Sequence, residues 1–401
     1  MDDAERSRLK TVVCDAVDSM ADRLIELSHR IHASPELQFE EVKASGWLTE
    51  MLEAGGLSVE RGLCGMPTSF IGRKVGRSGG PKVACVAEYD ALAEVGHACG
   101  HNILGTSNVG AAIALGHTIG ELDGEVLVFG TPAEEGGGGK IPFVEQGYFD
   151  DVAAVVTMHP QGHASRPTVG GRCLAVQPLT FKFYGRAAHA AGNPHEGINA
   201  LDALIQTFNG INAMRQHVRQ EVRIHGTITH GGGAPNVTPD FTQGEFLVRA
   251  PSAEEVRQVT ERVIGCAQAG ALATGARMEV ERGPFYEDMW PNAALGRAAV
   301  QNLAALGLDP VPTMPYLGSY STDLGNISRA CPTTSISMPI AGRGIGPHHR
   351  DFAAAAASPA GDLGLIHAAK AIAMTAIDVL TDPELRQQAR AQWQSTKDAA
   401  G

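Results

Sequence analysis

The sequence predicts an α/β fold for the larger part of the chain and a smaller α+β domain inserted into it. Short runs dense in valine alternate with helix-like stretches through the first 160 residues, which is typical of a sheet covered by helices on both faces. From residue 176 the order changes to β-α-β-β-α-β, which is the order of a ferredoxin-like domain. After residue 286 the first pattern returns, so the smaller domain interrupts the larger one.

The first part of the larger domain is predicted to span residues 1–175. Helices are expected at residues 43–55, which end at a glycine, and at residues 105–120. Continuously apolar runs bounded by glycine, proline or charged residues predict buried strands at residues 82–90, 125–131 and 153–159.

The inserted domain is predicted to span residues 176–286, and the second part of the larger domain residues 287–401. Within the inserted domain, the pattern predicts strands at residues 176–185, 221–230, 245–250 and 276–282, and helices at residues 198–216 and 252–273. The last part is expected to add a strand at residues 333–340 and helices near residues 293–306 and 359–381.

Length and charge limit the class of protein. The chain has 401 residues, which predicts two or three domains at about 100–200 residues each. Its formal net charge is −12 and no stretch is rich in lysine and arginine, so we expect no nucleic-acid partner. The amino terminus lacks the apolar core of a signal peptide and no long uninterrupted apolar run follows, so we expect a cytoplasmic protein that does not bind membranes. Seven cysteines, never spaced as CxxC, argue against a disulfide framework.

Residues that bind metals or transfer protons follow each predicted strand of the larger domain. They are Glu88 and Asp90 after the first strand, Glu134 and Glu135 after the second, His159 on the third, and His348 and His349 after the last. Each of these residues alone has an ordinary structural explanation. Ligands in open α/β sheets bind beyond the carboxyl ends of the strands, so we expect these groups to converge on one crevice.

The segment HACGH and the Glu134-Glu135 pair indicate a metal site. Cys99 and His101, two residues apart, project the same way from an extended backbone, and thiolate with imidazole suits zinc, cobalt or similar first-row ions. Adjacent glutamates diverge, so one can bind a metal while the other reaches a metal-bound water. Such a water has its pKa lowered toward about 7, and a glutamate can take its proton and give it to a leaving amine.

Seven motifs, taken in order, resemble the signatures of the dinuclear metallo-aminoacylase/carboxypeptidase family of amidohydrolases. They are HRIHASPELQFEE (29–41), EYDAL with GHACGHNILGTSNVGAA (88–112), GTPAEEGGGGK (130–140), GRAAHAAGNPHEGINALDAL (185–204), THGGGAPNVTPD (229–240), STDLGNIS (321–328) and PHHRDFA (347–353). The forms CGHN and STDLGNIS are most similar to the branch with the aminobenzoyl-glutamate hydrolase subunit and the β-alanyl-dipeptide hydrolases. The resemblance implies a zinc-peptidase-like catalytic domain and an inserted lid domain through which the chain forms a homodimer.

The resemblance also implies roles at the metal centre. Two divalent ions, Zn²⁺, Mn²⁺ or Co²⁺, would be bound by a set of five ligands with Glu134 as the general base, the ligands being Cys99, His101, Glu135, His159 and His348. His348 is preferred to His349 because the ligand of the family precedes a phenylalanine by four residues, as His348 precedes Phe352.

The first strand departs from a common pattern of the family. Many relatives have His-x-Asp there, with the histidine as a ligand, where this chain has Glu88, Tyr89 and Asp90. In the branch with CGH, His101 would supply the missing ligand, and Asp90 would orient it. Whether Glu88 contacts a metal stays open, and the alternative is a structural carboxylate paired with a lysine or arginine.

Three residues of the lid domain have implied roles. His189, in GRAAHAA, resembles the histidine that reaches the active site of the partner subunit and stabilises the oxyanion. Asn236 and Arg249 resemble groups that hold the amide and carboxylate ends of the substrate, although a salt bridge within the lid is an equal alternative for Arg249. Residues 176–286 carry 10 basic and 10 acidic residues, and this neutral charge suits a self-associating domain.

Together these features predict a metal-dependent hydrolase that cleaves an amide bond by a metal-bridging hydroxide, with Glu134 as the general base. The substrate stays open among a small N-acyl amino acid, an aminobenzoyl-glutamate-like conjugate and a dipeptide. One alternative is a cysteine hydrolase with Cys99 as the nucleophile, although such a site does not need a Glu-Glu pair and two further histidines. The other is an inactive relative that only binds ligands, although every expected group is present.

Overall fold

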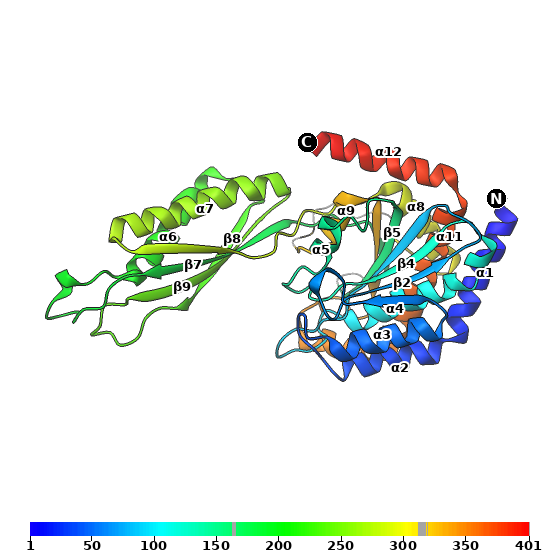
Figure 1. The fold of residues 1–401 in the computed structure, drawn as a ribbon, viewed down its shortest axis with the longest axis horizontal. Helices are drawn as coiled ribbons and strands as arrows, with labels where there is room; N and C mark the ends of the chain where they lie inside the picture. Colours follow the sequence, from blue (N-terminus) through cyan, green and yellow to red (C-terminus); the bar gives the residue numbers. More distant parts are fainter. Residues whose placement is uncertain (163–165, 312–317, 319, 401) are drawn as a thin grey trace. The chain divides into compact units, whose positions relative to one another are not determined.

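The computed structural model describes residues 1–162, 166–311, 318 and 320–400 of the chain (Figure 1). The chain is divided into two compact units. The first consists of Met1–Arg172, Met289–Leu317 and Asp323–Gly401, and the second of Cys173–Asp288 and Gly318–Thr322. The predicted inserted domain, residues 176–286, lies within the second unit, and the two predicted parts of the larger domain provide nearly all of the first.

The first unit is built on a seven-stranded sheet in the order β1-β2-β4-β3-β5-β11-β6. The strands are β1 (Ser58–Arg61), β2 (Phe70–Val75), β3 (Lys82–Ala87), β4 (Glu125–Gly130), β5 (Val152–Gln161), β6 (Thr168–Val169) and β11 (Thr333–Pro339). The four predicted strands are the parallel centre, β4-β3-β5-β11, while the strands outside it pair antiparallel. The sheet is therefore mixed, and its four parallel strands end at one edge.

Helices cover this sheet and explain why its central strands are continuously apolar. They are α1 (Asp3–Ser19), α2 (Ala21–His32), α3 (Val42–Ala54), α4 (His101–Gly116), α5 (Lys140–Glu145), α8 (Ala293–Ala305), α9 (Leu324–Ala330), α10 (Arg350–Ala355), α11 (Pro359–Thr381) and α12 (Pro383–Ala400). Every residue of α4 and of β4 is buried. A helix that is buried on all sides carries apolar residues all round, so α4 and α11, which contact each other and the central strands, form the centre of the core.

Among the described residues, α11 is the one helix that is long and apolar enough to cross a membrane by length and composition. Most of its apolar stretch is buried inside the first unit, where it packs against α1, α4 and α8. Core helices of globular proteins pass the same test of length and composition. The burial of α11 explains its apolar sequence as packing.

The second unit has the predicted order β-α-β-β-α-β. Its elements are β7 (Ala175–Tyr184), α6 (Ala200–Met214), β8 (Arg223–His230), β9 (Phe241–Ala250), α7 (Ala253–Thr274) and β10 (Arg277–Arg282). The strands form an antiparallel sheet in the order β10-β7-β9-β8, and the two helices pack together over a separate apolar core. Asn199 and Ser252 cap the two helices, and Gly275, at φ 78°, ends the second. The predicted ferredoxin-like fold is thus confirmed.

Candidate metal centre

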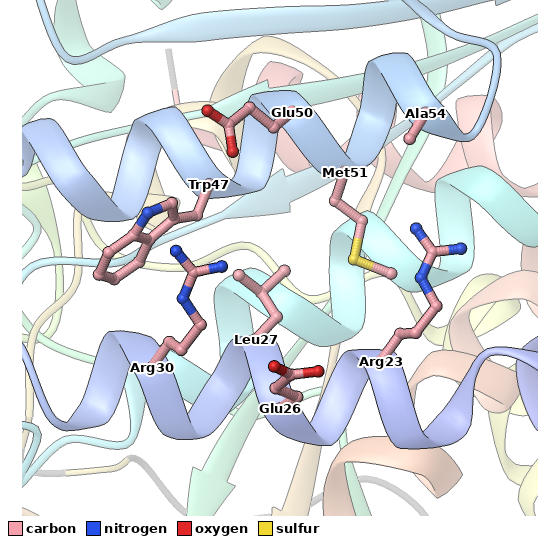
Figure 2. Close-up of a pocket in the computed structure, with 8 residues that line it drawn as sticks. All are labelled: Arg23, Glu26, Leu27, Arg30, Trp47, Glu50, Met51 and Ala54. Atoms are coloured by element: carbon pink, nitrogen blue, oxygen red, sulfur yellow. The ribbon is translucent and has the colours of Figure 1, made fainter.

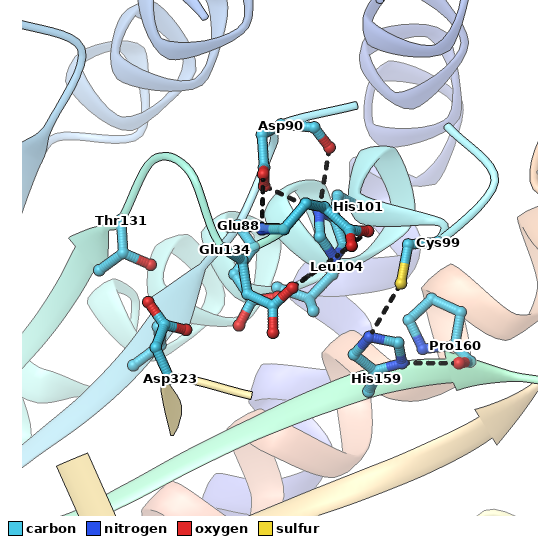
Figure 3. A network of polar contacts seen from close by, with 12 residues as sticks. Glu88, Asp90, Cys99, His101, Leu104, Thr131, Glu134, His159, Pro160 and Asp323 are labelled. Atoms are coloured by element: carbon cyan, nitrogen blue, oxygen red, sulfur yellow. Dashed lines mark hydrogen bonds and ion pairs between the residues drawn. The ribbon is translucent and has the colours of Figure 1, made fainter. Parts of the chain in front are cut away.

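The predicted metal-binding residues come together near the carboxyl ends of the parallel strands. Figure 3 shows three of them, Cys99, His101 and His159. Three overlapping groups of side chains each place their ligand atoms within 4.8 Å of one another: Cys99 with His101 and His159, Cys99 with Glu135 and His348, and Glu88 with His101 and Glu134. Cys99 belongs to two of the groups, and so does His101. All of these residues belong to the first unit.

The first group joins the segment before α4 to the end of β5. Cys99 Sγ lies 3.5 Å from His159 Nε2, and Figure 3 shows the sulfur directed at this ring. His159 Nδ1 lies 2.7 Å from the carbonyl oxygen of Pro160. This contact makes Nδ1 the donor and leaves Nε2 with a lone pair, which is the tautomer that a metal-binding histidine needs.

Asp90 fixes the orientation of His101. Its Oδ1 lies 2.9 Å from His101 Nδ1, and its Oδ2 accepts the backbone N–H of Glu135 at 2.9 Å. One carboxylate thus holds the imidazole of the first group and the backbone of the second. This geometry suits the orienting role predicted for Asp90, because a carboxylate behind a histidine turns its other nitrogen toward the metal.

The second group contains His348, and His349 faces elsewhere. His348 Nε2 lies 3.3 Å from Glu135 Oε2, and its backbone, at φ 67°, donates to the carbonyl of Ala98 at 2.8 Å. His349 instead caps α10, where its Nδ1 accepts the N–H of Asp351 at 3.2 Å. Of the two histidines, His348 lies in a ligand group and His349 caps a helix.

Glu88 divides its two oxygens between a lysine and the third group. Its Oε1 lies 2.9 Å from Lys140 Nζ, and its Oε2 lies 3.4 Å from His101 Nε2. Burial would raise the pKa of Glu88, but Lys140 and His101 outweigh it and hold that pKa below its ordinary value. The lysine pairing that was the alternative for Glu88 is thus present, and one oxygen still faces the histidine.

The side chains that converge here fit a bound metal. Three of their atoms, His101 Nε2, Glu88 Oε2 and Glu135 Oε1, are buried and have no hydrogen-bond partner among the described residues. Leaving such atoms without partners is costly, and a cation would satisfy all three. The donors are one thiol, imidazoles and carboxylates, which is the set that first-row divalent ions prefer.

Electrostatics distinguish the thiol of Cys99 from a catalytic nucleophile. Burial raises the pKa of Cys99 well above its ordinary value, and Glu135 adds to the shift. A reactive cysteine needs the opposite, a lowered pKa that exposes a thiolate. Burial, Glu88 and Glu135 likewise raise the pKa of Glu134. Without a metal the Cys99 thiol therefore keeps its proton, and metal binding would release it.

The local backbone differs from the extended segments predicted around these residues. Gly100 has a left-handed backbone at φ 77°, and His101 is the first residue of α4. Ala133, at φ 59°, turns the chain just before Glu134. A sharp turn, rather than alternation along a strand, therefore aims Cys99 and His101 at one place.

Sequence reasoning missed Glu41, which holds this second turn in place. Glu41 is fully buried, accepts the N–H of Ala133 at 2.8 Å through Oε1, and accepts the hydroxyl of Thr68 at 3.0 Å through Oε2. Burial raises the pKa of Glu41 from 4.5 to about 7, and Asp90 contributes to the shift. The only signal was its place in the first of the seven motifs.

Replacing Glu41 by glutamine should change how stability depends on pH in the metal-free protein. A raised pKa means that the folded state holds the proton more tightly, so stability falls as the pH rises from 4.5 to about 7. At about 1.4 kcal/mol per pKa unit, the loss is about 3 kcal/mol. Glutamine keeps an oxygen for the Ala133 N–H and has no charge, so it should recover much of this loss at pH values above about 7.

The check is urea unfolding of the unsubstituted protein and of Glu41→Gln, both without metal. One series is measured below pH 4.5 and the other above about pH 7. The exposed neighbour substitution Glu40→Gln is the control. A difference between Glu41→Gln and the unsubstituted protein that is the same at both pH values would contradict the account.

The second unit carries the three residues predicted for the lid. His189 is exposed, and its Nδ1 accepts the N–H groups of Ala191 and Gly192 at 3.2 and 3.1 Å. The backbone N–H of Ala190 donates to the carbonyl of Asn236 at 3.0 Å, so the segments of His189 and Asn236 lie together. His189 thus has its Nδ1 occupied locally, which leaves Nε2 as the nitrogen for another partner.

Arg249 lies on β9 and donates to the hydroxyl of Ser321 at 2.7 Å. Among the residues that the structure describes, it has no carboxylate partner, so the salt bridge considered as its alternative is absent from the lid. Partial burial lowers its pKa. Arg249 thus has guanidinium N–H groups beyond the one bound to Ser321.

A pocket between α2 and α3 contains none of the predicted residues (Figure 2). Its lining combines two arginines and two glutamates with apolar side chains, and the Arg30 guanidinium lies 4.3 Å from the Trp47 ring. A cation–π contact of this kind stabilises the packing of two helices. The pocket accordingly has a structural explanation and does not compete with the metal centre.

Comparison with known proteins identifies the relatives of the chain. Residues 178–274 match the peptidase dimerisation domain family. The chain is 36% identical to the Xaa-Arg dipeptidases of Mus musculus and Homo sapiens, with 95% of this chain and 91% of each relative covered. It is also 36% identical to a subunit of the p-aminobenzoyl-glutamate hydrolase of Escherichia coli strain K12, with 73% of this chain and 64% of that protein covered.

Solved structures agree with these relatives. A Bacillus subtilis protein, described as a dinuclear metal-binding peptidase of the M20 family, is 25% identical, with a TM-score of 0.67 and with 90% of this chain and 99% of that one covered. An aminobenzoyl-glutamate utilization protein from Klebsiella pneumoniae shares the fold at a TM-score of 0.71 and 18% identity, with 91% of this chain and 97% of that one covered. The predicted resemblance is therefore confirmed: the chain belongs to the M20 peptidase family and is a hydrolase of peptide or amide bonds.

Proposed function

We propose that the protein is a metal-dependent amidohydrolase that releases an amino acid from a dipeptide or an N-acyl amino acid conjugate. The observation that carries this proposal is the buried cluster at the strand ends, where unpartnered donor atoms converge beside Glu134. The cluster offers a thiol, imidazoles and carboxylates in three overlapping groups, two of which share Cys99. That sharing supports two ions, as in the Bacillus subtilis relative, which is described as dinuclear.

The proposed ligands are Cys99, His101, Glu135, His159 and His348. Bound Zn²⁺, Mn²⁺ or Co²⁺ would polarise the carbonyl of the substrate and lower the pKa of a coordinated water. Asp90 and the carbonyl of Pro160 hold the two imidazoles in the tautomers that binding needs. The chain itself therefore provides both the donors and the groups that orient them.

Glu134 is the proposed general base, and it then serves as the acid. Its carboxylate takes the proton of the attacking water and gives it to the departing amine. Glu134 is 6% exposed, and burial with neighbouring carboxylates raises its pKa. Divalent cations at the neighbouring ligands would oppose this shift, so the carboxylate would be ionised in the loaded enzyme.

The second unit would contribute to binding the substrate. His189 of the partner subunit would donate from Nε2 to the developing oxyanion, because its Nδ1 is held by backbone groups. Asn236 would bind the amide, and Arg249 would bind the free carboxylate of the released amino acid. This assignment calls for a homodimer, which the match to a peptidase dimerisation domain supports.

The substrate class follows from what the names of the relatives share. One relative is named for dipeptides that end in arginine and the other for an aminobenzoyl conjugate of glutamate. In both, the amide nitrogen belongs to an amino acid with a free carboxylate, while the acyl group differs. We therefore propose that the carboxylate of this amino acid, recognised by Arg249, is the common determinant of substrate binding. We also propose that the enzyme acts in the cytoplasm.

The test is an assay of the metal-loaded protein against a matched panel of amides. The panel contains dipeptides with C-terminal arginine, lysine or glutamate, β-alanyl dipeptides, N-acetyl amino acids and aminobenzoyl-glutamate, each also as its C-terminal amide. We expect turnover on at least one acid and a loss of about 10–100-fold on its amide, because the charge-assisted bond to Arg249 is lost. Equal turnover of acid and amide would contradict the role of the carboxylate, and no turnover across the panel would contradict the proposed substrate class.

A further inference from the structure

A fully buried lysine lies beside the metal centre and has no role in the function proposed so far. Lys140 follows the glycine run 136–139 and begins α5. Its ammonium lies 2.9 Å from Glu88 Oε1 and forms a second ion pair with Asp323, which also accepts the backbone N–H of Lys140 at 3.1 Å. A buried ammonium needs such partners, and here two sequence motifs far apart in the chain supply the cation and its anchor.

The two oxygens of Glu88 have different surroundings. Oε1 is held by Lys140, whereas Oε2 is buried and has no hydrogen-bond partner among the residues that the structure describes. Oε2 lies 3.4 Å from His101 Nε2, which is also buried and unpartnered. A cation between these two atoms would complete the coordination of both, since neither has a hydrogen-bond partner among the described residues.

We propose that Lys140 is a positioning residue, anchored on Asp323, that holds Glu88 so that its Oε2 binds one of the two divalent ions together with His101. The proposal rests on the proposed function, because it requires the metal centre, and it adds Glu88 to the ligands of that centre. The lysine does not touch the metal or the substrate. It fixes which oxygen of Glu88 faces the ion.

Charge explains why a lysine, rather than a neutral donor, occupies this place. Glu88, Glu134 and Asp323 are all buried, and Lys140 is the buried cation that lies among them. Without it, the mutual repulsion of the three carboxylates would favour movement of the Glu88 side chain, which would take Oε2 away from His101. The ammonium of Lys140 therefore keeps the Glu88 carboxylate in place.

Calorimetric titration of the metal-free full chain with Mn²⁺ tests this proposal without any assay of turnover. Glu88→Gln removes the charge of the proposed ligand but leaves Lys140 on Asp323. The double substitution Lys140→Met with Asp323→Asn removes one positive and one negative charge and leaves Glu88 without its anchor. In both variants we expect one of the two Mn²⁺ affinities to fall about 10–100-fold and the other to stay unchanged.

Lys82→Met is the matched control. Lys82 is the first residue of β3, at the opposite end of the strand that leads to Glu88, and it forms ion pairs with Asp151 and Glu125. The Lys82→Met variant should bind two Mn²⁺ ions with the affinities of the unsubstituted chain. Thermal unfolding without metal reports whether each variant is folded. If the double variant is not folded, the single substitution Asp323→Asn takes its place. This variant keeps Lys140 and should still weaken one Mn²⁺ site.

Unchanged Mn²⁺ affinities in Glu88→Gln would overturn the assignment of Glu88 as a ligand. A weakened site in Glu88→Gln would overturn the positioning role of Lys140 if the Mn²⁺ affinities are unchanged in the double variant, or in Asp323→Asn where that replaces it. An unsubstituted chain that binds no Mn²⁺ would instead contradict the metal centre, and hence the proposed function itself. The two failures are therefore distinguishable.

Discussion

Replacing Glu134 by glutamine should lower kcat by about 10²–10⁴-fold, which is the usual contribution of a general base. Glutamine has the same shape but cannot take a proton from water. The KM and the bound metal should change little, because Glu134 is not among the proposed ligands. Steady-state kinetics on the best amide of the panel, with metal content measured by mass spectrometry, check this prediction.

Glu134 lies in one ligand group with Glu88 and His101, so it could be a metal ligand instead of the general base. The metal content of Glu134→Gln decides between these two roles. Loss of metal in Glu134→Gln would make Glu134 a ligand, and near-normal turnover would remove it from the mechanism. The control is Glu145→Gln, an exposed glutamate at the end of α5 in the same unit, which should leave both readouts unchanged.

The second large effect is expected at Cys99, where two substitutions separate a ligand from a nucleophile. Cys99→Ala removes the donor that two ligand groups share, so it should lose metal and at least about 100-fold in activity. Cys99→Asp supplies a carboxylate, which can bind divalent ions but cannot act as a thiol nucleophile. We expect it to recover part of the metal content and of the metal-dependent activity.

A cysteine hydrolase would behave differently, because both substitutions would abolish activity equally and neither would alter metal content. Cys331→Ala is the control. This thiol is also buried, but it lies just before β11, at the amino end of the strand and not at its carboxyl end. It should lose some stability and keep the activity and metal of the folded fraction.

The sequence was most informative where topology alone decides the outcome. Parallel strands that end at one edge bring the segments of Asp90, Glu135 and His159 close together. The continuous apolar runs identified these strands because both of their faces are buried. The strands β1, β2 and β6 escaped prediction. In β1 and β6, four and two residues give too little periodicity to recognise.

Other parts of the centre could not be predicted because they depend on tertiary contacts. The ion pair of Lys140 with Asp323 joins residues 183 positions apart, and neither motif alone indicates a partner for the other. The left-handed turn at Gly100 replaces the extended backbone expected there, although both bring Cys99 and His101 to one place. Helices α1 and α12 are mostly polar, and their few buried side chains gave little signal.

The measurement that tests the central claim most directly is a titration of hydrolysis against bound metal. The chain is stripped with a chelator and reloaded stepwise, and turnover is measured together with the number of ions per chain. The account predicts no turnover in the stripped protein and a rise that is complete when two divalent ions are bound. Full turnover by the metal-free chain, or a maximum that does not depend on metal content, would contradict it.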